Sequence, residues 1–358
     1  MLDSGVVPLP HYDTQMKHSI SGLSSGAFMT VQMHIAHSAL FVGAGVIAGG
    51  PYRAAETFRG AAPTKPLSCI LNSLYIAMTP LTASTAPDVD KLVALAKETP
   101  DIDKLDNLAG QRLYIFTGTK DRVVNQHAVR TTVEFYKELG VDPNHIEFVQ
   151  DVPAGHSIIT MNPEDSDLDK NQPPYINRGT FIQSHDILDQ IYDHKLAPAA
   201  DHAEGDLIRF DQSEFYGHAP SQASMAPFAY AYIPSQVRDK AEKAIGVHIV
   251  MHGCKQGYDY TNFVNGKADI LNQPPYGDRY ITTTGYMEKG EANNIILLFP
   301  QVGGDDNNAV QNPDGCWDWW GYSSQDEHDP DYYSQKAVQI HAIYKMLKQL
   351  GGVPGGKK

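Results

Sequence analysis

Apolar runs and helical periodicities alternate along this chain. Short runs of consecutive apolar residues predict buried strands, and apolar residues that recur every three or four positions predict helices. The predicted strands cover 18–21, 41–50, 112–118, 146–152, 226–233, 246–253 and 294–301. The predicted helices cover 25–38, 88–99, 125–140, 181–193 and 334–351. Because helices separate most of the strands, we expect an α/β fold with a mostly parallel, doubly wound sheet covered on both faces.

A polar region interrupts this pattern in the middle of the chain. Residues 153–225 are rich in Pro, Asp, Asn and Ser and contain one convincing helix. Each half of the chain has too few strands to close a core alone. We therefore expect one domain over residues 1–350, with 153–225 as an irregular excursion, although a domain boundary there is the alternative. The Gly-rich residues 351–358 predict a flexible tail.

Composition excludes several classes of protein. Apolar residues make up 42% of the chain and charged residues 20%, as in soluble globular proteins and unlike disordered ones. The net charge of −14 would repel phosphate backbones, so we expect no nucleic-acid partner. No apolar run is long enough to span a bilayer. The start of the chain lacks the features of a signal peptide, so the protein is either cytosolic or has lost its leader.

A candidate nucleophile lies between the first predicted strand and helix. Residues 22–26, GLSSG, fit the pattern G-x-S-x-G, in which a sharp strand-to-helix turn raises a serine hydroxyl above a sheet. The pattern alone is weak, but the strand before it and the helix after it strengthen it. Ser24 is therefore the predicted nucleophile, and an ordinary helix N-cap is the alternative.

A serine nucleophile requires a base and a carboxylate that orients the base. Asp121 follows the strand at 112–118, and His156 follows the strand at 146–152 on a loop that contains glycine. The order Ser, Asp, His matches that of the α/β hydrolases. We predict a catalytic triad of Ser24, Asp121 and His156; a turn aspartate and a surface-loop histidine are the alternatives.

Ester hydrolysis also requires backbone N–H groups that bind the oxyanion. Ser25, at the start of the helix, should supply one amide. The second normally comes from a His-Gly loop after a strand, which 252–254 provides. In other hydrolases of this fold that loop precedes the nucleophile, whereas here it follows by about 230 residues. The sequence therefore predicts a circularly permuted α/β-hydrolase fold.

Five segments together resemble the polyhydroxyalkanoate depolymerase family, whose members degrade poly(3-hydroxybutyrate). They are GLSSGAFM at 22–29, TGTKDRVV at 117–124, AGHSI at 154–158, HGCKQ at 252–256 and GCWDWWGY at 315–322. The arrangement is similar to that of the circularly permuted, single-domain members. The resemblance implies a polyester substrate and its oligomers, the same triad, and Ser25 and Cys254 as oxyanion-hole donors. It implies no cofactor, no metal and a secreted or periplasmic protein, which we expect to be a monomer.

The last of these segments contains all three tryptophans. Its Asp318 and the polar residues 303–315 before it favour the rim of a cleft, where aromatic faces could hold a polyester chain. The candidate substrate-binding residues are Trp317, Trp319, Trp320 and Tyr322. Packing of the rings in the core is the alternative.

Three cysteines occur, without a CxxC pair, so a zinc cluster is not indicated. Cys254 and Cys316 both lie in segments expected near the active site. A disulfide between them would hold the tryptophan segment beside the oxyanion hole, and buried free thiols are the alternative. We expect Cys69 to be a buried apolar residue.

Two other functions remain open on the sequence alone. A feruloyl or acetyl-xylan esterase would use the same chemistry on a carbohydrate ester. A binding protein on a hydrolase scaffold would use no chemistry at all, but all three triad residue types are present, which disfavours it.

Overall fold

A computed structural model describes most of the chain. The described residues are 5–57, 73–217, 223–261, 263–264, 267–268, 276–304, 312–324, 326 and 330–354. Cys69 and residues 305–311 of the polar loop therefore lie outside the described residues. None of the described helices is both long and apolar enough to cross a bilayer.

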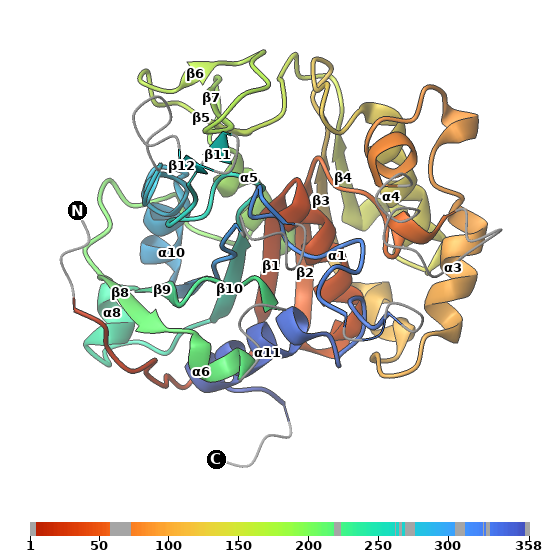
Figure 1. Cartoon of the computed structure of the whole chain (residues 1–358). Coiled ribbons are helices and arrows are strands. Elements are labelled where there is room, and N and C mark those ends of the chain that lie inside the picture. Colours follow the sequence, from red (N-terminus) through yellow and green to blue (C-terminus); the bar gives the residue numbers. More distant parts are fainter. Residues whose placement is uncertain are drawn as a thin grey trace.

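An eight-stranded sheet forms the centre of the molecule (Figure 1). Its spatial order is β4-β3-β2-β1-β10-β13-β9-β8. The bounds are β1 His18–Leu23, β2 Phe41–Ile47, β3 Arg112–Phe116, β4 Ile146–Val149, β8 Asp206–Asp211, β9 Phe228–Ile233, β10 Gly246–Met251 and β13 Ile295–Phe299. All pairs from β4 to β13 are parallel, and β9 runs antiparallel to both of its neighbours. The expected mostly parallel α/β sheet is confirmed.

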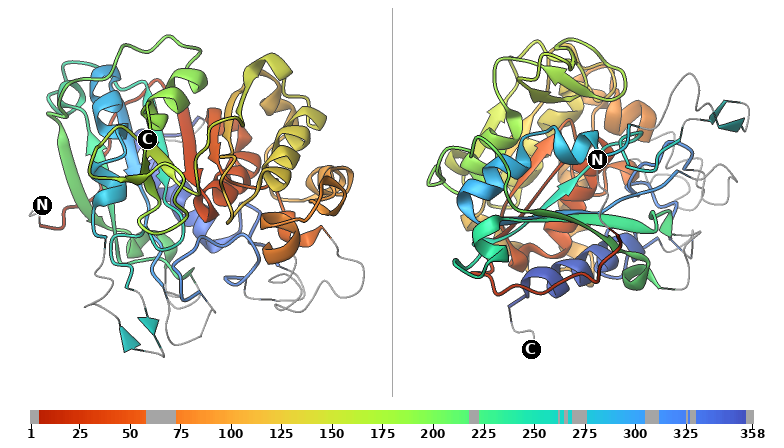
Figure 2. Two further views of the ribbon diagram at one scale, coloured as in Figure 1. Left: turned by 90° about the horizontal axis from the view of Figure 1, so that it is seen from above. Right: turned by 90° about the vertical axis from the view of Figure 1, so that its left-hand side faces the viewer.

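Helices cover both faces of this sheet (Figure 2). The longer ones are α1 Ser25–Ala36, α3 Val89–Glu98, α4 Gln126–Glu138, α5 Gln183–Ile191, α10 Tyr286–Asn293 and α11 Val338–Gly351. Helices α1 and α11 contact β10 on one face, and α5 and α10 contact each other and the strands on the opposite face. Four-residue helices also occur: α6 Ser213–Tyr216, α8 Ser235–Arg238 and α9 Arg279–Thr282.

The polar excursion contributes to two sheets. Three short parallel strands, β5 Ile158–Thr160, β6 Ser166–Asp167 and β7 Ile176–Arg178, form a small sheet of their own. Strand β8 pairs with β9 at the edge of the main sheet. Outside the excursion, β11 Phe263–Val264 and β12 Lys267–Ala268 form a separate two-stranded ribbon. The excursion is therefore more ordered than its composition predicts.

The two ends of the described chain lie together. Tyr12 N donates to Leu350 O at 2.9 Å, and Thr14 Oγ1 donates to Gly351 O at 2.7 Å. Gly351 closes α11, and Val353 is buried. Residues 351–353 therefore pack against the N-terminal segment, contrary to the expected flexible tail over 351–358. Residues 355–358 lie outside the described residues.

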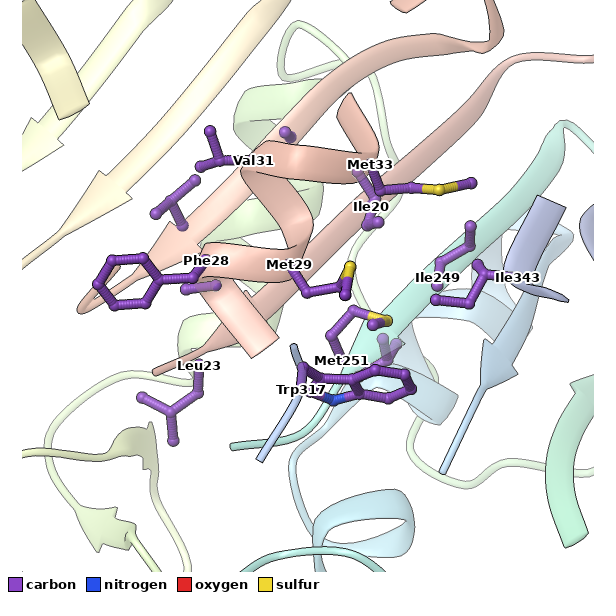
Figure 3. Packing of buried hydrophobic residues seen from close by; sticks show 14 of the residues in the cluster. Ile20, Leu23, Phe28, Met29, Val31, Met33, Ile249, Met251, Trp317 and Ile343 are labelled. Carbon is purple, nitrogen blue, oxygen red and sulfur yellow. The ribbon is translucent and has the colours of Figure 1, made fainter. Parts of the chain in front are cut away.

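Helix α1 is buried on every side, although its sequence predicts an amphipathic helix. One side lies on β1 and β2, and the other is covered by Trp317 and by α11 (Figure 3). Figure 3 shows Met29 and Met251 with the indole of Trp317, and Met33 with Ile249 and Ile343. A helix enclosed in this way holds its first turn, and with it Ser24, in a fixed place.

We expect Met29→Ala to lower the free energy of unfolding by about 2–5 kcal/mol, because Met29 is fully buried and its truncation leaves a cavity. Leu81→Ala is the matched control, because Leu81 is 89% exposed and should change stability by less than about 0.5 kcal/mol. Urea denaturation of both variants measures the difference. Equal stabilities of the two variants would contradict the enclosed position of α1.

Candidate active site

Ser24 lies in a strained turn between β1 and α1. Its φ of 58° and ψ of −124° are unusual for a residue with a side chain, and such strain is typical of a nucleophile elbow. Gly22 and Gly26 allow the turn, because a Cβ on Gly22 would lie 2.3 Å from Gly26 O. Ser24 N donates to Ile47 O at the end of β2, which fixes the turn to the sheet.

Asp121 and His156 form a buried pair beside this turn. His156 Nδ1 lies 2.8 Å from Asp121 Oδ2, and the two side chains are 3% and 1% exposed. Asp121 Oδ1 accepts hydrogen bonds from the amides of Val123 and Val124, which hold the carboxylate in place. Because a carboxylate only accepts, His156 carries its proton on Nδ1 and leaves Nε2 free to accept one.

Asn171, which sequence analysis missed, joins the loops that carry this pair. Its Oδ1 accepts from the amides of His156 at 3.0 Å and Arg122 at 2.9 Å, and its Nδ2 donates to Lys120 O. Asn171 lies in the polar excursion, about fifty residues after Asp121. No local pattern marks it, since its role depends on two loops that meet only in the fold.

The loop after β10 packs directly against the serine turn. A Cβ on Gly26 would lie 2.3 Å from His252 O, and a Cβ on Gly253 would lie 3.2 Å from Ser24 Cβ. Two segments separated by about 230 residues are thus in backbone contact. Within the described part of the chain, neither the amide of Ser25 nor that of Cys254 has a hydrogen-bond acceptor. Both amides are therefore available to a ligand.

A cavity of about 320 Å³ collects these groups. Ser24, Ser25, His156 and Cys254 line it together, and this volume is within the usual range for small-molecule sites. Most of the remaining wall is apolar: Leu23, Phe28, Met78, Val123, Tyr175, Trp319 and Trp320. The rings of His156 and Tyr175 make an edge-to-face contact, with ring centroids 5.6 Å apart. No sequence pattern marks Met78 or Tyr175.

The four aromatic candidates separate in the structure. Trp319 and Trp320 line the cavity, and Trp319 stacks on Phe28 with ring centroids 3.9 Å apart. Trp317 is 0% exposed and packs against the ring of His252. The hydroxyl of Tyr322 donates to Cys316 O. The expectation of a substrate cleft therefore has to be corrected for Trp317 and Tyr322, which pack the segment instead of lining the cavity.

Asp318 also needs correction, because its charge suggested an exposed rim. It is 1% exposed, and its carboxylate accepts hydrogen bonds from the backbone amides of residues 320–323. Burial raises the pKa of Asp318, while these donors favour its ionised form. The carboxylate therefore holds the turn that presents Trp319 and Trp320.

A disulfide joins Cys254 to Cys316. It links the loop that carries the free Cys254 amide to the aromatic segment, which is also held to α1 by Gln32 Nε2 donating to Asp318 O. No group of potential metal ligands is found among the described residues.

The mostly parallel sheet, the strained serine turn and the helices on both faces define an α/β hydrolase. No family model matches the chain. It is 31% identical over 340 residues to a poly(3-hydroxybutyrate) depolymerase of Delftia acidovorans, with 94% of this chain and 60% of that protein aligned. It is 28% identical over 344 residues to a polyhydroxybutyrate depolymerase of Talaromyces funiculosus, with 93% and 88% aligned.

Two solved structures share the whole fold. The crystal structure of PHB depolymerase from Penicillium funiculosum matches with a TM-score of 0.77 and 25% identity, over 96% of this chain and 98% of that one. A PHB depolymerase with a serine replaced by alanine, complexed with an R3HB trimer, matches with a TM-score of 0.78 and the same identity and coverage. The chain is therefore similar to named poly(3-hydroxybutyrate) depolymerases in sequence and fold, and the resemblance found from its motifs is confirmed.

The disulfide generates a direct prediction. Because two of the three cysteines are bonded, alkylation of the denatured, unreduced protein should modify one cysteine per chain, and reduction beforehand should raise this to three. Intact mass spectrometry measures both states. Three modified cysteines without reductant would contradict the bond.

Proposed function

We propose that this protein is a serine esterase that hydrolyses poly(3-hydroxybutyrate) or related polyhydroxyalkanoates. One observation carries the proposal: a strained serine, a buried Asp–His pair and two free amides meet at a single cavity. The named relatives supply the substrate class. The chain spans only 60% of the Delftia protein, so its activity and substrate remain part of the proposal.

The proposed reaction has two stages. Ser24 Oγ attacks an ester carbonyl while His156 Nε2 takes its proton, and the amides of Ser25 and Cys254 bind the oxyanion. When the ester C–O bond breaks, His156 protonates the departing alkoxide oxygen of the next monomer, which leaves a 3-hydroxyacyl ester on Ser24. Water, deprotonated by His156, releases the acid. Asp121 orients the imidazole and stabilises its charged form.

The cavity wall supports an aliphatic polyester over a carbohydrate ester. Its aromatic and aliphatic side chains suit methyl and methylene groups, and Trp319 and Trp320 offer ring surfaces. Of the polar side chains in the wall, the buried Asn312 is already bonded to Ser224 and to the backbone of Cys316, whereas Lys255 and Asp314 form a partly exposed ion pair at 3.6 Å. The wall therefore offers mainly apolar surface, and its exposed polar groups are confined to this one ion pair among the side chains just named.

The strand order supports circular permutation. The oxyanion loop follows β10, which pairs directly with β1 before the nucleophile. In other hydrolases of this fold the corresponding strands come first, whereas here they come from the second half of the chain. The contact between residues 12–14 and the end of α11 supports this inference. A permutation opens the chain at one loop, so the two new ends begin as neighbours in space.

The proposal also covers domain organisation, oligomeric state and localisation. We infer one catalytic domain over residues 1–350, which acts as a monomer. We also infer export to the periplasm or the medium, because disulfides persist in oxidising compartments and this one joins two parts of the active site.

We expect Ser24→Ala to lower turnover of poly(3-hydroxybutyrate) by about 10³–10⁶-fold, because no other group takes the place of the nucleophile. Clearing of a polymer suspension and labelling by a fluorophosphonate measure the loss, and an unchanged circular dichroism spectrum shows that the fold is kept. A variant that still clears the suspension would refute the assignment of Ser24.

The substrate class has a separate test. We expect the wild-type protein to hydrolyse hydroxybutyrate oligomers with a higher kcat/KM than feruloyl or acetyl-xylan esters, because the wall of the cavity is mostly apolar. Product analysis of all three substrates under one set of conditions measures the preference. A higher kcat/KM on the carbohydrate esters would overturn the polyester assignment and leave the serine chemistry standing.

A further inference from the structure

Gln256 ties together two loops that border the cavity. Its side chain is buried, and the residue is only 3% exposed although it contributes to the cavity wall. Its Oε1 accepts a hydrogen bond from Gly253 N at 2.6 Å. Its Nε2 donates to Pro174 O at 2.8 Å and, over a longer distance of 3.4 Å, to Tyr175 O. Both amide hydrogens are therefore engaged with the protein.

The first of these bonds determines which amide of the 252–254 loop is free. Gly253 N is occupied by Gln256, whereas the next amide, Cys254 N, has no acceptor among the described residues. The loop thus presents one donor to the cavity instead of two adjacent ones. A donor contributes most to catalysis when its direction is fixed before the charge develops.

His252 fixes the same loop from its other side. Its Nε2 accepts from Val302 N at 3.1 Å, so the proton lies on Nδ1, which donates to Gly253 O at 2.7 Å. Burial lowers the pKa of His252 to about 4, which keeps the ring neutral near pH 7. Gly253 O and Cys254 N belong to one planar peptide unit, so a held carbonyl also fixes the direction of the N–H group.

The second bond of Gln256 reaches the wall behind the candidate base. Pro174 precedes Tyr175, whose ring makes an edge-to-face contact with the ring of His156 at an interplanar angle of 83°. One side chain therefore connects the loop with the free Cys254 amide to the residue that packs on His156. A shift of this side chain would move both the oxyanion donor and the support of the base.

We propose that Gln256 is a positioning residue for ester hydrolysis, which holds Gly253 so that the Cys254 amide faces the oxyanion and links this loop to the wall behind His156. The proposal rests on the proposed function, because it assigns a role within the same site. Gln256 acts through Cys254 and His156 and does not take part in bond making.

The test compares two buried glutamines. Gln256→Met removes both hydrogen bonds at nearly constant volume. Gln190→Met is the matched control, because Gln190 is also 3% exposed and donates to Leu113 O and His145 O away from the cavity. Both variants are assayed on p-nitrophenyl butyrate for kcat and KM. Binding of phenylboronic acid, which forms a tetrahedral adduct with an active-site serine, is measured alongside binding of 3-hydroxybutyrate.

We expect Gln256→Met to lower kcat by about 10–100-fold, somewhat less than the loss of an oxyanion donor itself, with KM within about threefold of the wild-type value. The affinity for phenylboronic acid should fall by about the same factor as kcat/KM. The affinity for 3-hydroxybutyrate should stay unchanged. Gln190→Met should lower stability without lowering kcat relative to KM and without weakening phenylboronic acid binding. A kcat for Gln256→Met within threefold of the wild type, or equal losses in both variants, would overturn the proposal.

Gln256→Glu supplies a second test if Gln256→Met does not fold. A carboxylate can accept from Gly253 N but cannot donate to Pro174 O, whereas the protonated acid can do both. The kcat of this variant, divided by that of the wild type at each pH, should rise as pH falls through the pKa of the introduced carboxyl. A flat ratio would overturn the proposal. Neither result depends on the substrate class, whereas an inactive wild type or an active Ser24→Ala would refute the proposed function instead.

Discussion

The structure depends on the contact between the serine turn and the loop after β10. The backbones of the two segments approach so closely that an added Cβ on Gly26 would lie 2.3 Å from His252 O, and one on Gly253 would lie 3.1 Å from Leu23 O. Parallel pairing of β1 with β10 brings the segments to the same edge of the sheet. Because both segments end at this edge, a nucleophile from the first fifth of the chain meets an amide from its second half.

The surroundings hold this contact rigid. Helix α1 is enclosed by the sheet on one side and by α11 and the tryptophan segment on the other. The disulfide attaches that segment to the loop, and the buried carboxylate of Asp318 holds its turn through backbone amides. A preorganised site requires support of this kind, since a donor that is displaced by about 1 Å loses much of its effect.

The sequence predicts those parts of the fold that local pattern determines. Strands β2, β3, β10 and β13 are almost wholly buried, so each forms a largely apolar run that can be recognised without knowledge of its neighbours. Asp121 follows β3, which is one of these runs, and His156 follows the half-buried β4. Ser24 follows the more polar β1 and is marked by the G-x-S-x-G pattern instead. Strand β8 escaped prediction because it is an edge strand with polar and half-buried residues.

Features that depend on distant partners could not be predicted. Asp318 suggested an exposed rim because the local sequence does not show that backbone amides surround its carboxylate in the fold. The full burial of α1 depends on Trp317, nearly 300 residues later. Asn171 and Gln256 are ordinary polar residues in sequence, and only the folded chain shows that each joins two loops of the site.

The most direct measurement is a crystal structure of the protein after reaction with a phosphonate ester, which mimics the tetrahedral intermediate. The account predicts phosphorus bonded to Ser24 Oγ, with one phosphonyl oxygen about 2.7–3.1 Å from the amides of both Ser25 and Cys254 and with His156 Nε2 beside the serine oxygen. Phosphorus on another residue, or a phosphonyl oxygen that faces away from the Cys254 amide, would contradict it.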